Sequence, residues 1–322
     1  MLVTGATGYI GCHVVSALQE CGHRVIAAVR TRDSARRLTD EGVAVEVTLA
    51  DLDDPGSMAS AAAAADATIH LAFDHQARDL SLAMQKDERV IRAILHAYAG
   101  TQKCLVVTTA TGMLGNTGPV PVDESFAGEP GFVLERRRAA EALLKEGSRA
   151  GVRSVSIRVP VITHGFAAKG LLQRLMLAAQ AEGISGFVGT GVNRLPTVHV
   201  RDLAQLYVSA LGVGSSSIYN AVGAEISMRA LAESIGAALG VPVRSILRHR
   251  ADDLWGAFYT TLLTLDNRPS GARARAELDW APYTSTPTLV QDILTFAPIE
   301  SAAASAGMPG GPMRVSGSAR LH

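Results

Sequence analysis

Cysteine, an excess of charge of either sign and long apolar segments are all scarce in this sequence, and each scarcity excludes a class of protein. The chain of 322 residues has three cysteines (Cys12, Cys21 and Cys104), which are widely spaced and form no Cys-x-x-Cys pair. This excludes a disulfide framework and is typical of a reducing cytoplasm. Thirty acidic and thirty basic residues leave no net charge, so there is no electrostatic case for binding nucleic acid or a membrane surface.

Patterns for targeting, membrane insertion and metal binding are missing as well. The alanine run 61–65 is far too short to span a bilayer, ends at Asp66 and follows the acidic stretch 51–54. A glycine-rich turn begins at the fourth residue, so we expect no signal peptide and a cytoplasmic location. The nine histidines are scattered, without a pair on one helix face beside a third ligand. We therefore expect no metal site.

What is present is a strand, glycine turn, helix and strand at the start of the chain. Leu2 and Val3 begin a short apolar strand, and residues 4–11 read Thr-Gly-Ala-Thr-Gly-Tyr-Ile-Gly. Apolar residues then recur at four-residue spacing, which predicts an amphipathic helix. Gly22 stands where a helix commonly ends, and residues 25–29 form a second apolar segment. The alternation continues along the chain and predicts an α/β protein.

The three glycines have distinct roles in a nucleotide site. Gly5 permits the tight turn out of the strand, Gly8 lets the backbone approach a pyrophosphate, and Gly11 allows the helix to pack closely on the sheet. The helix N-terminus then offers unpaired N–H groups and a positive dipole end to the anion. Between a strand and an amphipathic helix, this spacing favours dinucleotide binding.

The turn Thr-Gly-x-x-Gly-x-x-Gly resembles that of the extended short-chain dehydrogenase/reductase family, in its epimerase/dehydratase branch, and other segments follow the order of that family as far as about residue 293. The resemblance implies a doubly wound parallel Rossmann sheet with a smaller C-terminal substrate lobe. We expect an NAD(P)-binding core over residues 1–165 and mainly substrate lobe, with returning core elements, over 166–298. Residues 299–322 are rich in Ala, Gly, Ser and Pro, which predicts a disordered tail.

Arg30 ends the second strand, where NAD-preferring sites usually have an acidic residue for the ribose 2′-hydroxyl. An arginine there can bind a 2′-phosphate with two hydrogen bonds, which favours NADP(H) and leaves NAD as the alternative. A solvated arginine at a strand end is the other interpretation. The resemblance implies that Asp51 contacts the adenine and that the next residue lines its ring, although Asp51 also suits the cap region of the next helix. The full set of residues expected at the cofactor is Gly5, Thr7, Gly8, Tyr9, Ile10, Gly11, Arg30, Asp51, Leu52, Leu71, Ala72, Thr108, Arg137, Val159 and Pro160.

The sequence departs from the family at its catalytic residues. Relatives open the helix after the fifth strand with Tyr-x-x-x-Lys, followed by a Glu four residues later. Aligning that Glu with Glu141 puts Arg137 at the lysine position and Val133 at the tyrosine position. Arg137 is suited to hold the nicotinamide ribose, but a guanidinium stays protonated in proteins and is therefore a poor proton shuttle. An exposed charge in a basic helix stretch is the other interpretation of Arg137. The family's Ser or Thr position holds Ala110, flanked by Thr109 and Thr111, either of which would supply the hydroxyl if the turn differed by one residue.

Several further residues are candidates for contact with a substrate. His75 lies just past the fourth strand, where ligands collect in open α/β sheets, and we expect it either to face the active cleft or to lie apart from it. Either His75 or His164 has a pKa suited to replacing the missing acid, and a bound water is the third possibility. A structural role is the alternative for each histidine and for Arg194. The candidates are His75, Met113, His164, Arg194 and His199.

Three functions are compatible with this pattern. The leading expectation is an NADP(H)-dependent oxidoreductase acting on a carbonyl or alcohol of a small to medium, fairly apolar substrate. The missing tyrosine motivates a second, a sensor or regulator that binds NADP(H) without turnover. The third is redox-neutral isomerisation or cyclisation. The resemblance also makes a homodimer possible.

Overall fold

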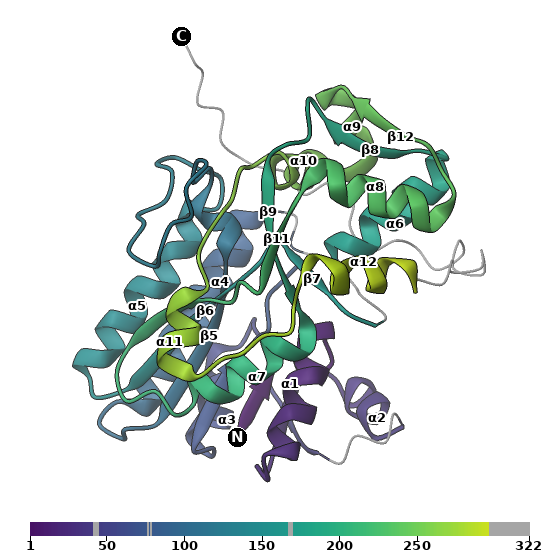
Figure 1. Ribbon diagram of the computed structural model, residues 1–322. Coiled ribbons are helices and arrows are strands. Elements are labelled where there is room, and N and C mark those ends of the chain that lie inside the picture. Colours follow the sequence, from purple (N-terminus) through teal and green to yellow (C-terminus); the bar gives the residue numbers. More distant parts are fainter. Residues whose placement is uncertain (41–44, 76, 78, 167–169, 296–322) are drawn as a thin grey trace.

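The computed structural model describes residues 1–40, 45–75, 77, 79–166 and 170–295. Its centre is a seven-stranded sheet in which every neighbouring pair runs parallel, as predicted for a doubly wound α/β fold (Figure 1). The inner strands are almost entirely buried, including polar residues such as Ser154 and Ser156, and the first four residues of the central strand at 104–110 form a continuous apolar run. In spatial order the strands are β10 (Ser217–Asn220), β6 (Arg153–Val159), β5 (Cys104–Ala110), β4 (Ala67–His70), β1 (Leu2–Thr4), β2 (Ile26–Val29) and β3 (Glu46–Leu49).

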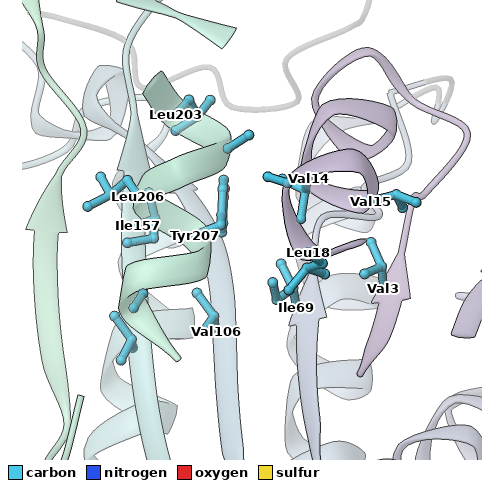
Figure 2. Packing of buried hydrophobic residues seen from close by; sticks show 14 of the residues in the cluster. Val3, Val14, Val15, Leu18, Ile69, Val106, Ile157, Leu203, Leu206 and Tyr207 are labelled. Carbon is cyan, nitrogen blue, oxygen red and sulfur yellow. The ribbon is translucent and has the colours of Figure 1, made fainter. Parts of the chain in front are cut away.

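Helices cover both faces of this sheet. One face carries α1 (Tyr9–Glu20) and α7 (Val200–Ala210), and α11 (Ala272–Leu278) packs beside α7. Figure 2 shows how apolar side chains of α1 and α7 meet those of the central strands. The other face carries α3 (Pro55–Ala63), α4 (Leu80–Tyr98) and α5 (Arg138–Arg149), which enclose a second apolar cluster. A shorter helix, α2 (Arg32–Asp40), follows β2 at the sheet margin.

The strand order reverses direction beside β1. From β1 the chain proceeds outward to β2 and β3, and then returns to add β4, β5, β6 and β10 on the other side. Helices flank the sheet on opposite faces at such a switch point, so their N-termini leave a crevice beyond the carboxyl ends of the strands. This is the place where the fold positions a ligand.

The C-terminal part of the chain adds a smaller lobe with its own apolar core. In one sheet β9 (Arg194–His199) lies between β7 (Ile162–His164), to which it is parallel, and β11 (Ala224–Ser227), to which it is antiparallel. A second, parallel pair joins β8 (Ser185–Val188) to β12 (Val243–Ile246). Around these strands pack α6 (Leu171–Glu182), α8 (Met228–Leu239), α9 (Arg248–Trp255), α10 (Ala257–Leu263) and α12 (Thr286–Leu294).

The chain passes repeatedly between the core and this lobe. After β7, β8 and β9 in the lobe it returns for α7 and β10, leaves again for β11 through α10, and comes back for α11 before it ends in α12. The predicted return of core elements after residue 166 has this form. The predicted disordered tail at 299–322 lies outside the described residues.

Local signals set several of these element boundaries. Gly22 has φ +77° and donates its N–H to Gln19 O at 2.9 Å, so α1 ends where the glycine predicted. The carboxylate of Asp54 accepts the N–H groups of Gly56 and Ser57 and caps α3. Asp51 instead accepts the N–H of Asp53 within the preceding turn.

One predicted helix starts later than expected. The sequence alignment placed Val133 on the helix that contains Arg137, but residues Glu135–Arg137 form a 3-10 turn (η2) and α5 begins only at Arg138. The segment before it turns inward to bury Leu134, and the Glu135 carboxylate accepts the N–H of Gly131 at 2.8 Å. This local turn replaces the first helical turn, so Val133 precedes the helix.

No helix in the described part of the chain has the length and apolar character needed to cross a membrane.

Candidate active site

The glycine turn between β1 and α1 is an anion-binding site in its geometry. Gly8 is the N-cap of α1 and provides no capping side chain, while its N–H donates to Gly5 O at 2.9 Å. A Cβ on Gly11 would lie 2.1 Å from Gly5 O, and one on Gly5, where φ is +67°, would lie 2.9 Å from Ala72 N. Larger residues would therefore force the turn open. The first turn of α1, which includes Tyr9 and Ile10, contains no acidic residue, so it keeps its positive end available.

The other predicted cofactor residues lie along one edge of the sheet, because each belongs to the carboxyl end of a parallel strand or to the loop after it. Arg30 follows β2 and is exposed, Asp51 and Leu52 follow β3, and Leu71 follows β4. Thr108 is in β5 and Val159–Pro160 is at the end of β6, while Thr7 is exposed on the glycine turn itself.

Arg137 is the cation of this edge. Its Nη1 donates to Asp87 Oδ2 and its Nη2 to Thr108 O, each at 2.9 Å, and its guanidinium lies 4.1 Å from the centre of the Phe73 ring. Its side chain is only 10% exposed. A guanidinium has five N–H donors, so three remain for other partners after these two bonds.

Asp87 is not among the residues predicted from the sequence, although α4 contains a signal for it. Buried apolar residues of this helix recur at Met84, Ile91 and Leu95, and Asp87 occupies the same stripe. A carboxylate at a core position is rarely left unpaired, and here it contacts both His70 on β4 and Arg137. His70 itself is buried in the sheet, as expected for a packed histidine.

The two threonines that flank Ala110 differ in whether their hydroxyls have partners. Thr109 is buried and bonds Ser156 (2.9 Å) and Glu141 (3.2 Å), which also pairs with Arg158. Thr111 is fully buried and its Oγ1 has no hydrogen-bond partner. The hydroxyl of Thr109 is therefore engaged within the core, whereas that of Thr111 is not, and the choice of either as the catalytic hydroxyl stays a prediction.

His75 does lie beside Arg137. Both side chains contact the ring of Phe73, with the His75 and Phe73 ring centres 5.1 Å apart. The imidazole keeps an exposed edge, yet the surrounding protein desolvates it; this lowers its pKa below 6.5, the Arg137 charge lowers it further, and Asp74 acts in the opposite direction. The predicted contact Met113 is buried near them in an apolar cluster with Leu134.

Comparisons with known proteins show the family and the fold of this chain. The model of the NAD dependent epimerase/dehydratase family matches residues 1–221. The chain belongs to this family.

Several known proteins are similar to this chain over most of its length. Uncharacterized protein C2A9.02 of Schizosaccharomyces pombe is 34% identical over 289 residues, which cover 89% of this chain and 96% of that one. The 3-diazoavenalumate denitrifying reductase of a Streptomyces species is 27% identical over 309 residues, covering 88% and 95%. Among solved structures, dTDP-glucose 4,6-dehydratase DesIV of Streptomyces venezuelae, with NAD bound, has a TM-score of 0.72 at 19% identity and covers 91% and 95%. UDP-glucose-4-epimerase of Stenotrophomonas maltophila, also with NAD bound, has a TM-score of 0.72 at 21% identity and covers 91% and 96%.

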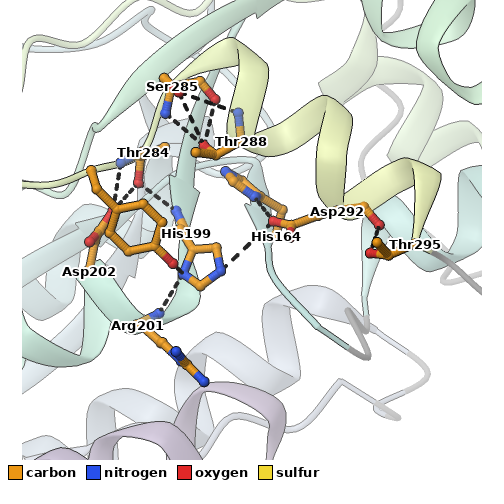
Figure 3. A network of polar contacts seen from close by, with 10 residues as sticks. His164, His199, Arg201, Asp202, Thr284, Ser285, Thr288, Asp292 and Thr295 are labelled. Carbon is orange, nitrogen blue, oxygen red and sulfur yellow. Dashed lines mark hydrogen bonds and ion pairs between the residues drawn. The ribbon is translucent and has the colours of Figure 1, made fainter.

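Two of the predicted substrate contacts of this family member lie together at the junction of core and lobe, in a polar network shown in Figure 3. His164 Nδ1 is 2.6 Å from Asp292 Oδ2, and its ring centre is 5.3 Å from that of His199. His199 caps α7: its Nδ1 accepts the N–H of Arg201 and is 2.6 Å from the hydroxyl of Tyr283. These partners hold both rings in place, while His164 Nε2 is buried without a hydrogen-bond partner, so contact of either histidine with a substrate stays a prediction.

Arg194 also has partners of its own. Its Nε lies 3.0 Å from Glu225 Oε1, and Arg268 binds the same carboxylate. The structure therefore brings His75 to the edge that holds Arg137 and assigns His164, His199 and Arg194 to contacts within and around the lobe. Among the described residues, no group of three His, Cys, Asp or Glu side chains is placed to hold a metal ion.

Proposed function

We propose that this protein is an NADP(H)-dependent oxidoreductase acting on a carbonyl or alcohol of a small to medium, fairly apolar organic substrate. The observation that carries the proposal is Arg137, held by Asp87 and Thr108 O at the carboxyl edge of the sheet that also presents the glycine turn. The reductase named among the relatives supports this class of chemistry. The substrate edge is apolar and aromatic, with Phe73, Val161 and Phe258 packed around the buried cluster.

The residues that are present define how the protein would act. When bound, the nicotinamide supplies or accepts a hydride. The free N–H groups of Arg137 would orient the nicotinamide ribose and stabilise negative charge that develops on a substrate oxygen. Val133 and Ala110 have no proton to give, so the proton comes from His75 or from a water. Because the pKa of His75 is lowered, its ring is neutral at pH 7 and acts at that pH by orienting a water.

The preference for NADP(H) depends on Arg30, which follows β2. Arg30 is exposed there and its chain neighbours Val29 and Thr31 are uncharged, while the nearest acidic residue along the chain, Asp33, lies 3.8 Å from the Arg36 guanidinium. An arginine recognises phosphate with paired hydrogen bonds.

Arg30→Ala tests this preference. Loss of a hydrogen bond to a charged group costs about 1.5–3 kcal/mol, so NADPH affinity should fall by roughly 10- to 100-fold while NADH affinity stays within about twofold. Fluorescence titration of both dinucleotides measures the ratio. Arg24→Ala, at an exposed pair with Glu46 before β2, is the matched control. An unchanged NADPH/NADH ratio would remove Arg30 from the cofactor site.

Turnover is tested by NADPH consumption against ketones, aldehydes and quinones, with binding titrated in parallel. Tight binding with steady oxidation is the expected result. A second candidate, a protein that binds NADP(H) without turnover, is favoured by one observation: hydroxyl groups are missing at both Ala110 and Val133. Tight binding without oxidation on any substrate would establish it, and failure to bind either dinucleotide would overturn both.

A further inference from the structure

We propose that Asp87 is a positioning residue that sets the orientation of Arg137, and that a chain of hydrogen bonds through His70 ties this orientation to the strand that carries the glycine turn. The inference rests on the proposed function only in taking Arg137 as a ligand of the nicotinamide half. Nothing in the family resemblance assigns a role to Asp87.

The hydrogen-bond donors along this chain are fixed by Thr4. Its Oγ1 accepts the N–H groups of Leu71 and Ala72, each at 3.1 Å, which occupies both lone pairs. Its own hydrogen must therefore go to His70 Nδ1, 2.8 Å away. This makes Nδ1 of His70 the acceptor and leaves the ring hydrogen on Nε2.

His70 Nε2–H then donates to Asp87 Oδ1 at 3.2 Å, and Arg137 Nη1 donates to Asp87 Oδ2 at 2.9 Å. With one oxygen bound on each side, the carboxylate cannot rotate without breaking a bond. The Asp87 side chain is 4% exposed, so water cannot replace either partner. Thr108 O holds the other arm of Arg137, and the guanidinium plane is defined by two fixed acceptors.

The same chain reaches the cofactor turn. Thr4 is the last residue of β1, and Gly5 follows it with its Cα packed against Ala72 so closely that a Cβ would meet Ala72 N at 2.9 Å. Leu71 and Ala72 thus contact both Thr4 and the turn. A shift of the turn is passed through Thr4, His70 and Asp87 to Arg137.

Asp87→Asn is the informative substitution, because the amide nearly preserves shape but replaces one acceptor by a donor. His70 and Arg137 both donate hydrogen bonds to Asp87, so the NH2 group of the asparagine must face a donor. His70 cannot move its ring hydrogen to Nδ1 to relieve this, because Nδ1 accepts the hydrogen of the Thr4 hydroxyl. The positive charge of Arg137 remains, but its orientation is released.

The experiment compares two ligands of wild type and variant by titration: NADPH, and 2′,5′-ADP, which carries the adenosine and 2′-phosphate but no nicotinamide. Asp87→Asn should weaken NADPH by about tenfold, the effect of one hydrogen bond to a charged group, and change 2′,5′-ADP by less than about twofold. In an Arg137→Ala background the same substitution should have no further effect on NADPH. The control is Asp202→Asn, which removes a buried carboxylate that accepts Thr284 N–H elsewhere in the core.

Each outcome separates the inference from the function. Loss of NADPH affinity in Arg137→Ala but not in Asp87→Asn would overturn the role of Asp87 and leave the proposed function standing. Equal losses for both ligands in Asp87→Asn, or additive effects in the double variant, would show that Asp87 is merely structural. If Asp87→Asn does not fold, His70→Phe removes the donor to Oδ1 while keeping the carboxylate, and the same selective loss is expected. Wild type that binds neither ligand would contradict the function itself.

Discussion

At Gly5, Gly8 and Gly11, backbone atoms of the turn or of the neighbouring strand loop lie close to the place that a Cβ would take. A Cβ on Gly11 would lie only 2.1 Å from Gly5 O, an overlap that no backbone adjustment at one residue can relieve. Gly8 is less constrained, since its Cβ would lie 3.1 Å from the same oxygen. The three positions are therefore unequal in what a substitution would do.

Gly11→Ala should disrupt both the fold and the cofactor site. The added methyl group overpacks the turn, which typically costs about 1–3 kcal/mol of unfolding free energy, and it displaces the N–H groups of α1 that would meet a pyrophosphate. Urea denaturation and NADPH titration measure the two effects. Gly214→Ala is the control, because a Cβ there meets nothing within 4 Å and the residue has no positive φ. Equal behaviour of the two variants would contradict the close packing described for Gly11.

At the scale of single residues, the sequence predicts geometry that depends on residues close to one another in the chain. The glycine spacing spans seven residues of one turn, so its geometry follows from local sterics. Asp87 and Arg137 are fifty residues apart, and their contact depends on how α4 and the segment before α5 pack together. The position of a carboxylate on the buried stripe of α4 indicates that Asp87 has a polar partner, but it does not identify Arg137 as that partner.

Among the elements, α5 begins later than the family pattern predicts. The expected tyrosine and lysine positions face the same side only if both lie on one helix, since residues four apart are neighbours there. The helix begins after both positions, at Arg138, and the 3-10 turn changes the direction of Val133 relative to Arg137. A pattern of helix-forming residues did not predict this, because burial of Leu134 outweighs local propensity.

Val133→Tyr should therefore fail to restore the usual acid. Its hydroxyl would stand before η2 and not one helical turn from Arg137, so NADPH oxidation on any carbonyl substrate should stay within about twofold of wild type. Steady-state kinetics on the wild-type substrate measures this. A gain of tenfold or more, about 1.4 kcal/mol of barrier, would mean that Val133 does occupy the place of the missing tyrosine.

At the scale of the whole molecule, four histidines in the described part of the chain share a lowered pKa, with desolvation as the largest cause in each: His13, His75, His164 and His199. Asp292 partly offsets the effect at His164 and His199. All four are more easily protonated in the unfolded chain, where their pKa is about 6.5. Because the folded protein favours the neutral form of these rings, its free energy of unfolding depends on pH.

The free energy of unfolding should be highest above about pH 6.5 and should decrease as the pH falls toward 5.5, because the unfolded state then binds protons that the folded state does not. Urea unfolding at half-unit pH intervals measures the slope. His164→Gln, which cannot take up a proton at this buried position, should have a shallower slope than wild type. A slope that does not change in His164→Gln would show that other groups produce the dependence.

The alternating path of the chain has a mechanical consequence. Five crossings connect core and lobe, after β6, β9, β10, α10 and α11. Limited proteolysis at any one crossing would leave core and lobe connected by the other four and the two fragments held together by noncovalent packing, so a nicked protein should elute from a sizing column as an intact particle. For the same reason the lobe cannot be excised as a single continuous gene fragment, and swapping it between relatives requires several coordinated splice points.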